Sequence, residues 1–223
     1  GQFATDAGRQ LVRRGLMTYA AAAMVMPYAA FAKAAEARAY DVEALARDFG
    51  TSFEQTAHRL TTLQKPGQER VPFFFLRIDK AGNVSKRLDG AGLSFAHHGG
   101  GCPLWNVHET FSRPGEVLTQ WLELPGGQRF FSVARTVIAG GGQFGQPRVE
   151  RAVALGCAAE HAGRLVYARL QPGLTADQAT PIGPTCRLCQ RIDCPARAAP
   201  PIGRQLLPDD YHRGRAPYAF ADR

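Results

Sequence analysis

The first 65 residues have the composition and residue spacing of helices. Residues 5–40 are rich in alanine and other strong helix formers, and Pro27 marks a boundary between two helices. Apolar residues then recur three or four positions apart over residues 42–49 and 53–63, which predicts two further short helices. We therefore expect a helical segment over residues 1–65.

Two polar residues indicate where the short helices begin. Asp41 precedes one helix, and Ser52 precedes the other with Gln55 three residues later, which is the spacing of a capping box. Gly50 between them is a typical helix terminator. Two short helices joined at a glycine also resemble a helix-turn-helix, but few residues suited to reading DNA bases follow the turn.

Beyond residue 65 the pattern changes to short apolar runs separated by turn-forming residues. Runs rich in aromatic and β-branched residues predict strands, and the intervening Gly, Asn and Pro residues predict hairpins. The five expected strands are residues 71–79, 84–88, 117–123, 129–138 and 148–156, and a helix is expected over residues 158–169. The sequence thus predicts an α+β fold, with N-terminal helices followed by a β-rich domain over residues 66–223 built on a central antiparallel sheet.

Residues 184–201, called the cysteine loop below, fit neither pattern. Cys186, Cys189 and Cys194 lie within nine residues, and the same segment contains four prolines. Prolines remove backbone donors and fix φ, so this segment is expected to be an ordered loop rather than a helix or a central strand. Three thiolates that bind a metal ion or an iron–sulfur cluster would supply that order. Unligated thiols or disulfides in a surface loop are the alternative.

A tetrahedral metal site or a cubane cluster needs a fourth ligand. Cys102 lies in HHGGGCPLW, where glycines allow the backbone to approach closely. Cys157 lies in VALGCAAEHAG, where a strand is expected to enter a helix whose N-terminus would stabilise a thiolate. Both remain candidates, as do histidines, so all five cysteines are candidate ligands. Zinc and a 4Fe–4S cluster are both compatible with a set of four thiolates.

Charge and composition limit the function further. The 223 residues have a net charge of +8 that comes mostly from arginine, which suits phosphate recognition but also occurs in the proteins of GC-rich genomes. Five cysteines are too few for a secreted disulfide scaffold and fit a reducing cytosol. Acid–base groups gather only at His97, His98, His108 and Glu109, and no G-x-S-x-G motif is present. We therefore expect a cytoplasmic protein that is not an enzyme.

One segment imitates a targeting signal. Arg13 and Arg14 precede an apolar run that ends near Ala35, as in a signal peptide. Pro27 interrupts that run, which is also too short to span a membrane. No membrane association is predicted.

Three stretches of the chain resemble a known family. They are similar to the C-terminal domain of the short-chain fatty-acyl transcriptional regulators. The stretches are RLTTLQKPG followed by VPFFFLRIDKAGNVSKR, then HHGGGCPLWNVHETF, and then CRLCQRIDCPARAAPP. These bacterial proteins are related to propionate (methylcitrate-cycle) regulators, and the resemblance extends from about residue 10 to about residue 212. It implies a homodimeric sensor of short-chain acyl-CoA such as propionyl-CoA. It also implies a 4Fe–4S cluster on the cysteines and an upstream helix-turn-helix of the phage-repressor type that binds DNA.

A coenzyme A ligand under this resemblance needs cations for its phosphates and an apolar slot for its acyl chain. The first hairpin supplies the candidate phosphate contacts, and the segment after Cys102 supplies an aromatic wall and groups to orient the thioester. The candidate ligand-binding residues are Arg77, Lys86, Arg87, Trp105, His108 and Arg113. A zinc-stabilised interaction module without a redox cluster remains the alternative.

The N-terminal segment has a second resemblance. It is similar to the tail of the metallopeptidase-like region found in antagonists of phage repressors. The resemblance lies in the stretches YAAAAMVMPYAAFAKA and DVEALARDFGTSFEQTAHRL. Such peptidases need an H-E-x-x-H motif, which these residues do not contain. We therefore expect residues 1–65 to be a helical structural part without a zinc site.

Overall fold

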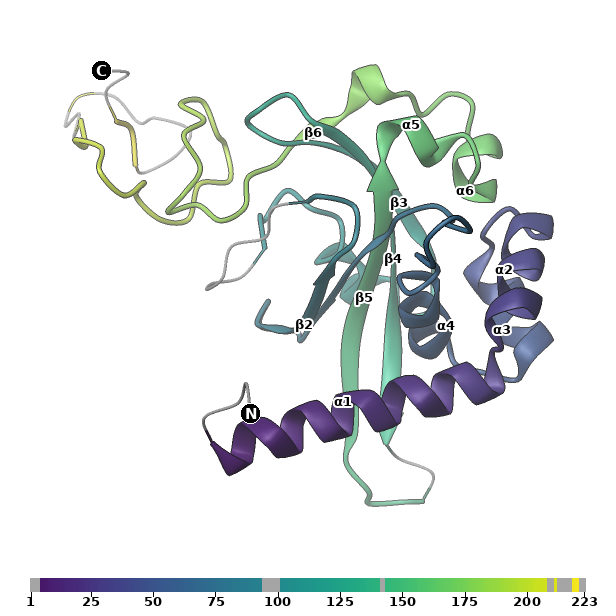
Figure 1. Ribbon diagram of the computed structural model, residues 1–223. Helices are drawn as coiled ribbons and strands as arrows, with labels where there is room; N and C mark the ends of the chain where they lie inside the picture. Colours follow the sequence, from purple (N-terminus) through teal and green to yellow (C-terminus); the bar gives the residue numbers. More distant parts are fainter. Residues whose placement is uncertain (1–4, 94–100, 141–142, 208–210, 212–217, 221–223) are drawn as a thin grey trace. The chain divides into compact units, whose positions relative to one another are not determined.

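The computed structural model describes residues 5–93, 101–140, 143–207, 211 and 218–220 (Figure 1). It contains two compact units, Gly1–Arg70 and Val71–Arg223. The predicted acid–base residues His97 and His98 lie outside the described residues. Within the described ranges no single helix is long and apolar enough to cross a membrane, and only the first two helices pass that test together, across a bend of 66°.

The first unit is helical, as the residue spacing predicts. Its helices are α1 (Asp6–Val25), α2 (Tyr28–Ala37), α3 (Val42–Phe49) and α4 (Phe53–Leu60). Phe31, Leu45 and Leu60 are fully buried. The buried Arg59 donates from Nε to the carbonyl oxygen of Met26 at 3.0 Å, which ties α4 to the end of α1.

The predicted helix boundaries are confirmed where they depend on local hydrogen bonds. The side chain of Asp41 accepts from the backbone N–H of Ala44 at 3.0 Å and caps α3. Gly50 ends α3 with a φ of 62°, a left-handed conformation that glycine adopts without steric cost. Ser52 and Gln55 form the expected capping box at the start of α4.

The second unit is built on one sheet. Its strands are β1 (Phe74–Ile78), β2 (Val84–Asp89), β3 (Leu118–Glu123), β4 (Arg129–Gly140), β5 (Arg148–Ala158) and β6 (Thr180–Pro181), in the order β2-β1-β5-β4-β3-β6. The five long strands are the predicted ones and pair antiparallel. The purely antiparallel sheet that we expected is wrong, because β6 pairs parallel to β3. A two-residue strand has no apolar alternation, so the sequence does not reveal it.

The helix predicted over residues 158–169 is wrong in its extent. Strand β5 continues to Ala158, since β4 supplies a partner as far as Phe130, which pairs with Ala158. Two short helices follow, α5 (Ala159–Ala162) and α6 (Val166–Arg169). The described residues of the unit also form the 3₁₀ turns η1 (Glu109–Ser112) and η2 (Ala176–Gln178).

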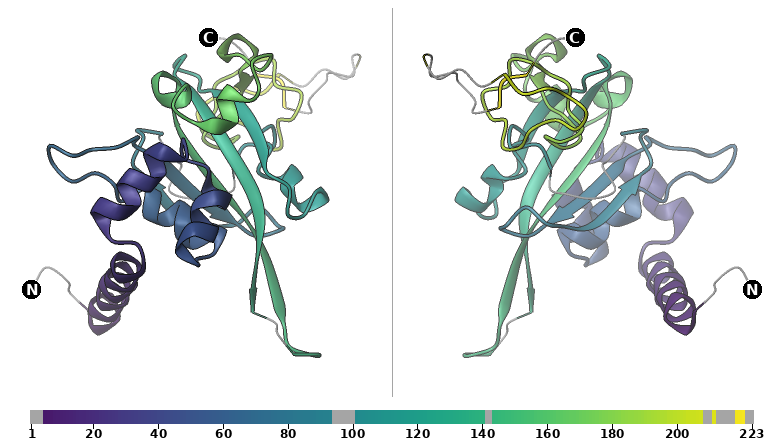
Figure 2. Two further views of the ribbon diagram at one scale, coloured as in Figure 1. Left: turned by 90° about the vertical axis from the view of Figure 1, so that its right-hand side faces the viewer. Right: turned by 90° about the vertical axis from the view of Figure 1, so that its left-hand side faces the viewer.

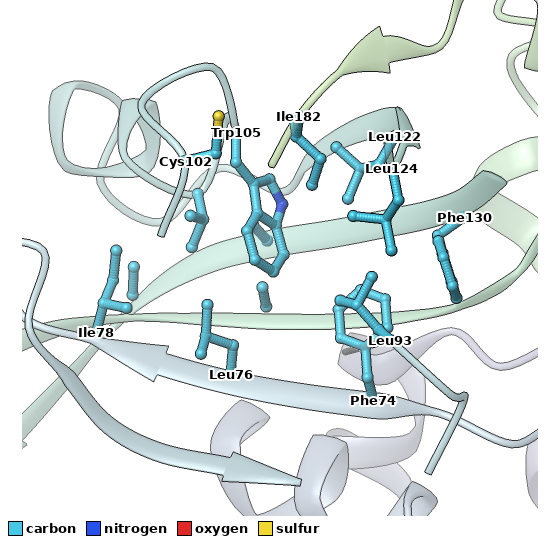
Figure 3. Packing of buried hydrophobic residues seen from close by; sticks show 14 residues of the cluster. Phe74, Leu76, Ile78, Leu93, Cys102, Trp105, Leu122, Leu124, Phe130 and Ile182 are labelled. Atoms are coloured by element: carbon cyan, nitrogen blue, oxygen red, sulfur yellow. The ribbon is translucent and has the colours of Figure 1, made fainter. Parts of the chain in front are cut away.

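One face of the sheet packs against the segment that follows Cys102 (Figure 3). The ring of Phe74 from β1 meets Trp105 edge-on at 5.9 Å and Phe130 from β4 at 6.2 Å. Ile182, just after β6, belongs to the same apolar cluster. The cluster therefore joins the sheet, the Cys102 segment and the start of the cysteine loop.

The views of Figure 2 show two parts of the second unit that project from the sheet. Strands β4 and β5 extend as a long hairpin beyond the other strands, and the cysteine loop lies at the opposite end of the sheet. That end is where β6 pairs with β3 and leads directly into the loop. The sheet edge thus fixes where the loop begins.

Candidate functional site

Four of the five cysteines line one pocket. Cys186, Cys189 and Cys194 reach it from the cysteine loop, and Cys102 reaches it from the segment between β2 and β3. Cys102 and Cys189 are buried, whereas Cys186 and Cys194 are half-buried. All five cysteines of the chain lie within the described residues, and each is a thiol. The structure thus brings together three neighbouring cysteines and a fourth from about 85 residues earlier in the sequence.

Cys102 is held at the pocket by the apolar cluster beside it. The backbone N–H of Trp105 donates to the Cys102 carbonyl at 3.0 Å, and the indole N–H donates to Ser132 Oγ at 3.1 Å. In Figure 3 the Cys102 sulfur points away from the other side chains of the cluster. Burial raises the pKa of the Cys102 thiol, and the neighbouring Cys186 and Cys194 raise it further. A bound metal cation would favour the thiolate form of this cysteine.

The start of the cysteine loop is anchored on β3. The backbone N–H of Ile182 donates to the Glu123 carbonyl at 2.9 Å, and Cys189 donates to the Thr185 carbonyl at 2.9 Å in a tight turn. Gly183 lies against Cys189 so closely that an added Cβ would come within 2.6 Å of the sulfur. A side chain at position 183 would therefore displace Cys189 from the pocket.

Two arginines line the same pocket. Arg197 is 3% exposed and donates to the carbonyl oxygens of Cys186 at 3.0 Å and Cys189 at 3.2 Å. Arg191 donates to the Glu123 carbonyl at 2.9 Å, and its guanidinium also lies 3.5 Å from the carboxylate of that residue. The sequence motif identified the cysteines but not these roles. A lone arginine among alanines and prolines, as at position 197, is the one local signal of such a role.

The four thiols that line the pocket are side chains of the type that ligate metals as thiolates. Thiolates are the ligands that zinc and iron–sulfur clusters prefer. The backbone N–H of Ala198 donates to Cys186 Sγ at 3.4 Å, a type of contact that tunes thiolate ligands of clusters. In the described part of the chain, no group of three His, Cys, Asp or Glu side chains has the arrangement needed to bind a single metal ion. The four thiols surround a pocket.

Cys157 does not line the pocket of the other four cysteines. It belongs to β5, pairs with Phe131 of β4 and is fully buried. Its neighbour Ala158 pairs with Phe130 of the apolar cluster, so strand alternation turns Cys157 to the opposite face of the sheet. Burial raises the pKa of its thiol to about 12. The strand enters a helix as expected, since α5 begins at Ala159 with Ala158 as its N-cap, but Cys157 itself still belongs to β5 and precedes that cap.

The proposed phosphate contacts of the first hairpin lie on both faces of the sheet. Arg77 pairs with Lys86 across β1 and β2, so these two side chains share a face, and Arg87 pairs with Leu76 on the other face. Arg77 Nε donates to Ser85 Oγ at 2.9 Å. Strand β2 is at the edge of the sheet, so a ligand at that edge can reach both faces.

The remaining candidate contacts are in the segment after Cys102. Trp105 is buried in the apolar cluster. His108 is buried enough to lower its pKa, and it lies beside Gly82 in the turn between β1 and β2. Arg113 is an exposed residue directly after η1. The pocket that the four cysteines line includes none of the six proposed coenzyme A contacts.

Comparison with known proteins identifies two families along the chain. Residues 62–218 match the family described as short-chain fatty acyl coenzyme A regulator, C-terminal. Residues 2–61 match the IrrE N-terminal-like domain. The boundary between the two matches lies close to the boundary between the two compact units.

Named relatives match the chain almost from end to end. The HTH-type transcriptional regulator RamB of Mycobacterium tuberculosis is 47% identical over 98% of the chain and 46% of its own length. The propionyl-CoA carboxylase regulator of Cereibacter sphaeroides is 44% identical over 99% of the chain and 48% of its own length. A solved structure described as a Mycobacterium tuberculosis transcriptional regulator is 40% identical and superposes with a TM-score of 0.89, covering 96% of this chain and 65% of that one.

The chain spans about half the length of the curated relatives that it matches. Those relatives are named as transcriptional regulators, and one name specifies propionyl-CoA carboxylase. The family match covers most of the chain and includes all five cysteines and the whole sheet. The chain therefore belongs to the short-chain fatty acyl coenzyme A regulators.

Proposed function

We propose that the second unit senses short-chain acyl-CoA for a bacterial transcription regulator and holds a 4Fe–4S cluster on Cys102, Cys186, Cys189 and Cys194. The observation that supports the cluster most strongly is the lining of one pocket by these four cysteines. The family and the propionyl-CoA carboxylase regulator support an acyl-CoA ligand. DNA binding belongs, in this proposal, to a helix-turn-helix outside these residues, and the active form is a cytoplasmic homodimer.

The cysteine loop supports a structural role for the cluster. Within the described residues the loop forms no helix or strand, and its start is fixed mainly through Ile182 and the turn at Thr185. Four ligand bonds would order such a segment strongly, since the free energy of metal binding is also free energy of folding. A bound cluster also supplies one-electron redox chemistry. Loss of the cluster to oxygen would then change the order of the loop.

The proposed site for coenzyme A lies at the edge of the first hairpin. Arg77 and Lys86 on one face and Arg87 on the other could bind the 3′-phosphate and the pyrophosphate of a ligand that lies across β2. His108 beside the hairpin turn and Arg113 after η1 are proposed to orient the thioester. Trp105 contributes the apolar floor beneath them from within the cluster.

Two measurements on the same preparation test the two halves of the proposal. Protein purified without oxygen should contain iron and sulfide and should be brown, and a colourless protein with one zinc per chain would indicate the zinc-stabilised module instead. Calorimetric titration with propionyl-CoA should give saturable binding that weakens in Lys86→Gln. The matched control is Lys33→Gln, which removes an exposed lysine from α2. Equal binding by both variants would contradict the proposed phosphate site.

A further inference from the structure

Among the described residues of the second unit, Arg197 is the most deeply buried cationic side chain. It connects several segments of the cysteine loop. It is 3% exposed, and its two terminal nitrogens donate to the carbonyl oxygens of Cys186, Cys189 and Arg191. The Phe220 ring covers the guanidinium with 4.9 Å between the Cζ atom and the ring centroid. One side chain therefore braces the backbone at two of the three loop cysteines.

The bonding of Arg197 is incomplete in one respect. Its Nε atom is buried and has no hydrogen-bond partner among the described residues. An arginine is always charged, and a buried donor without an acceptor costs about 1–3 kcal/mol, more for a charged group. No carboxylate of the described chain pairs with Arg197, since its contacts are three carbonyls and an aromatic ring. Buried charges in proteins are generally paired with an opposite charge.

The proposed cluster would place such an anion in the pocket. Arg197 lines the same pocket as the four cysteines, and a cluster held by four thiolates has a net negative charge. Arg191 lines the pocket too, but it already has a carboxylate neighbour in Glu123. The two arginines therefore differ within the described residues: Arg191 has a carboxylate neighbour there, and Arg197 has none.

We propose that Arg197 is a positioning residue for the thiolate-bound centre. Its terminal nitrogens fix the loop backbone, while its Nε–H and its positive charge compensate the negative charge of the bound group. This inference rests on the proposed iron–sulfur centre and adds to it a residue that sets the reduction potential. A positive charge beside a cluster stabilises the reduced form, which has one more electron, and so raises the potential.

The test compares Arg197→Gln and Arg197→Lys with the control Arg187→Gln. Arg187 is an exposed arginine in the same loop whose side chain does not line the pocket. Each protein is purified without oxygen, analysed for iron and sulfide, and titrated with dithionite to obtain the midpoint potential of the cluster. The glutamine variant at position 197 should shift the one-electron equilibrium at least tenfold towards the oxidised form, about 59 mV. The lysine variant keeps the positive charge, so its midpoint potential should return most of the way to the wild-type value. The control should match the wild type.

The outcomes separate this inference from the proposed function. A wild type without iron and sulfide contradicts the cluster itself. A loaded Arg197→Gln protein with the wild-type potential contradicts only the role of Arg197. If the glutamine variant binds no iron, Arg197→Lys decides: recovery of iron supports charge compensation. A lysine variant that also lacks iron would show that Arg197 only braces the loop, and charge compensation would be wrong.

Discussion

Strand β5 and the cysteine loop each bury a cysteine, but different interactions hold them. Cys157 lies in β5, whose backbone is bonded to β1 on one side and β4 on the other. Cys189 lies in a loop that a turn at Thr185 and the side chain of Arg197 keep in place. The sheet supplies its own stability through pairing and packing, whereas the loop leaves its thiols directed at a pocket. The difference supports the proposal that Cys157 is structural and that the cysteines of the loop are ligands.

The largest expected effect is on the sheet. Phe74→Ala removes a fully buried ring that contacts Trp105 and Phe130, and the cavity should lower the free energy of unfolding by about 3–5 kcal/mol. Urea denaturation followed by circular dichroism measures the loss. The exposed Phe144, on the β4–β5 hairpin, provides the control, because Phe144→Ala should change stability by less than about 0.5 kcal/mol. Similar losses in both variants would mean that packing at the cluster does not stabilise the sheet.

Removal of the proposed cluster should affect the cysteine loop and leave the central strands of the sheet unchanged. After exposure to oxygen and a chelator, cleavage by trypsin at Arg187 should become about tenfold faster, because the ligand bonds that order the loop are lost. Amide exchange in β4 and β5 should remain unchanged, since their hydrogen bonds do not involve the loop. Equal trypsin cleavage before and after the treatment would show that no bound group orders the cysteine loop.

A smaller effect should appear at alkaline pH. The pKa of the Cys157 thiol is raised to about 12 by burial, so the unfolded state loses this proton near pH 9 while the folded state keeps it. The folded state then binds more protons, and stability falls as pH rises, by up to about 1.4 kcal/mol per pH unit from this group. Cys157→Ala should therefore show a shallower loss of unfolding free energy between pH 9 and pH 11 than the wild type. Parallel curves would mean that the thiol ionises normally in the fold.

The smallest expected effect is in the first unit. Ser52→Ala removes the cap that accepts from the Gln55 N–H and should cost about 1 kcal/mol. Helicity measured at 222 nm during thermal unfolding should show the loss. Ser52→Asp, which preserves an N-cap acceptor, is expected to retain the wild-type midpoint, and a loss as large as that of alanine would contradict the capping role.

The features that depend on neighbouring residues were predictable from the sequence. Asp41, Gly50 and Ser52 mark helix boundaries because each acts on backbone groups within three or four residues. The five long strands were predictable because each is a short run rich in apolar, aromatic or β-branched residues between turn-forming residues. The family and its three-cysteine motif were likewise recognisable, because the residues that carry them stand in unbroken stretches of the sequence.

Features that depend on distant pairing were not predictable. Cys157 remained a candidate ligand because the last residues of β5 are strand only through their pairing with β4. Strand β6 exists only because β3 is beside it. The role of Arg197 depends on carbonyls that converge after the loop has folded. Each of these depends on contacts between residues far apart in the sequence or on a loop with no periodic pattern.

The proposed ligand set is tested most directly by the iron and sulfide contents of Cys102→Ser and Cys157→Ala, purified without oxygen beside the wild type. Cys157→Ala should retain the wild-type content and colour, because its thiol lies on the far face of the sheet. Cys102→Ser should lose most of the iron, since it removes one of the four thiols that line the pocket. Full iron in Cys102→Ser together with its loss in Cys157→Ala would contradict the proposed ligand set.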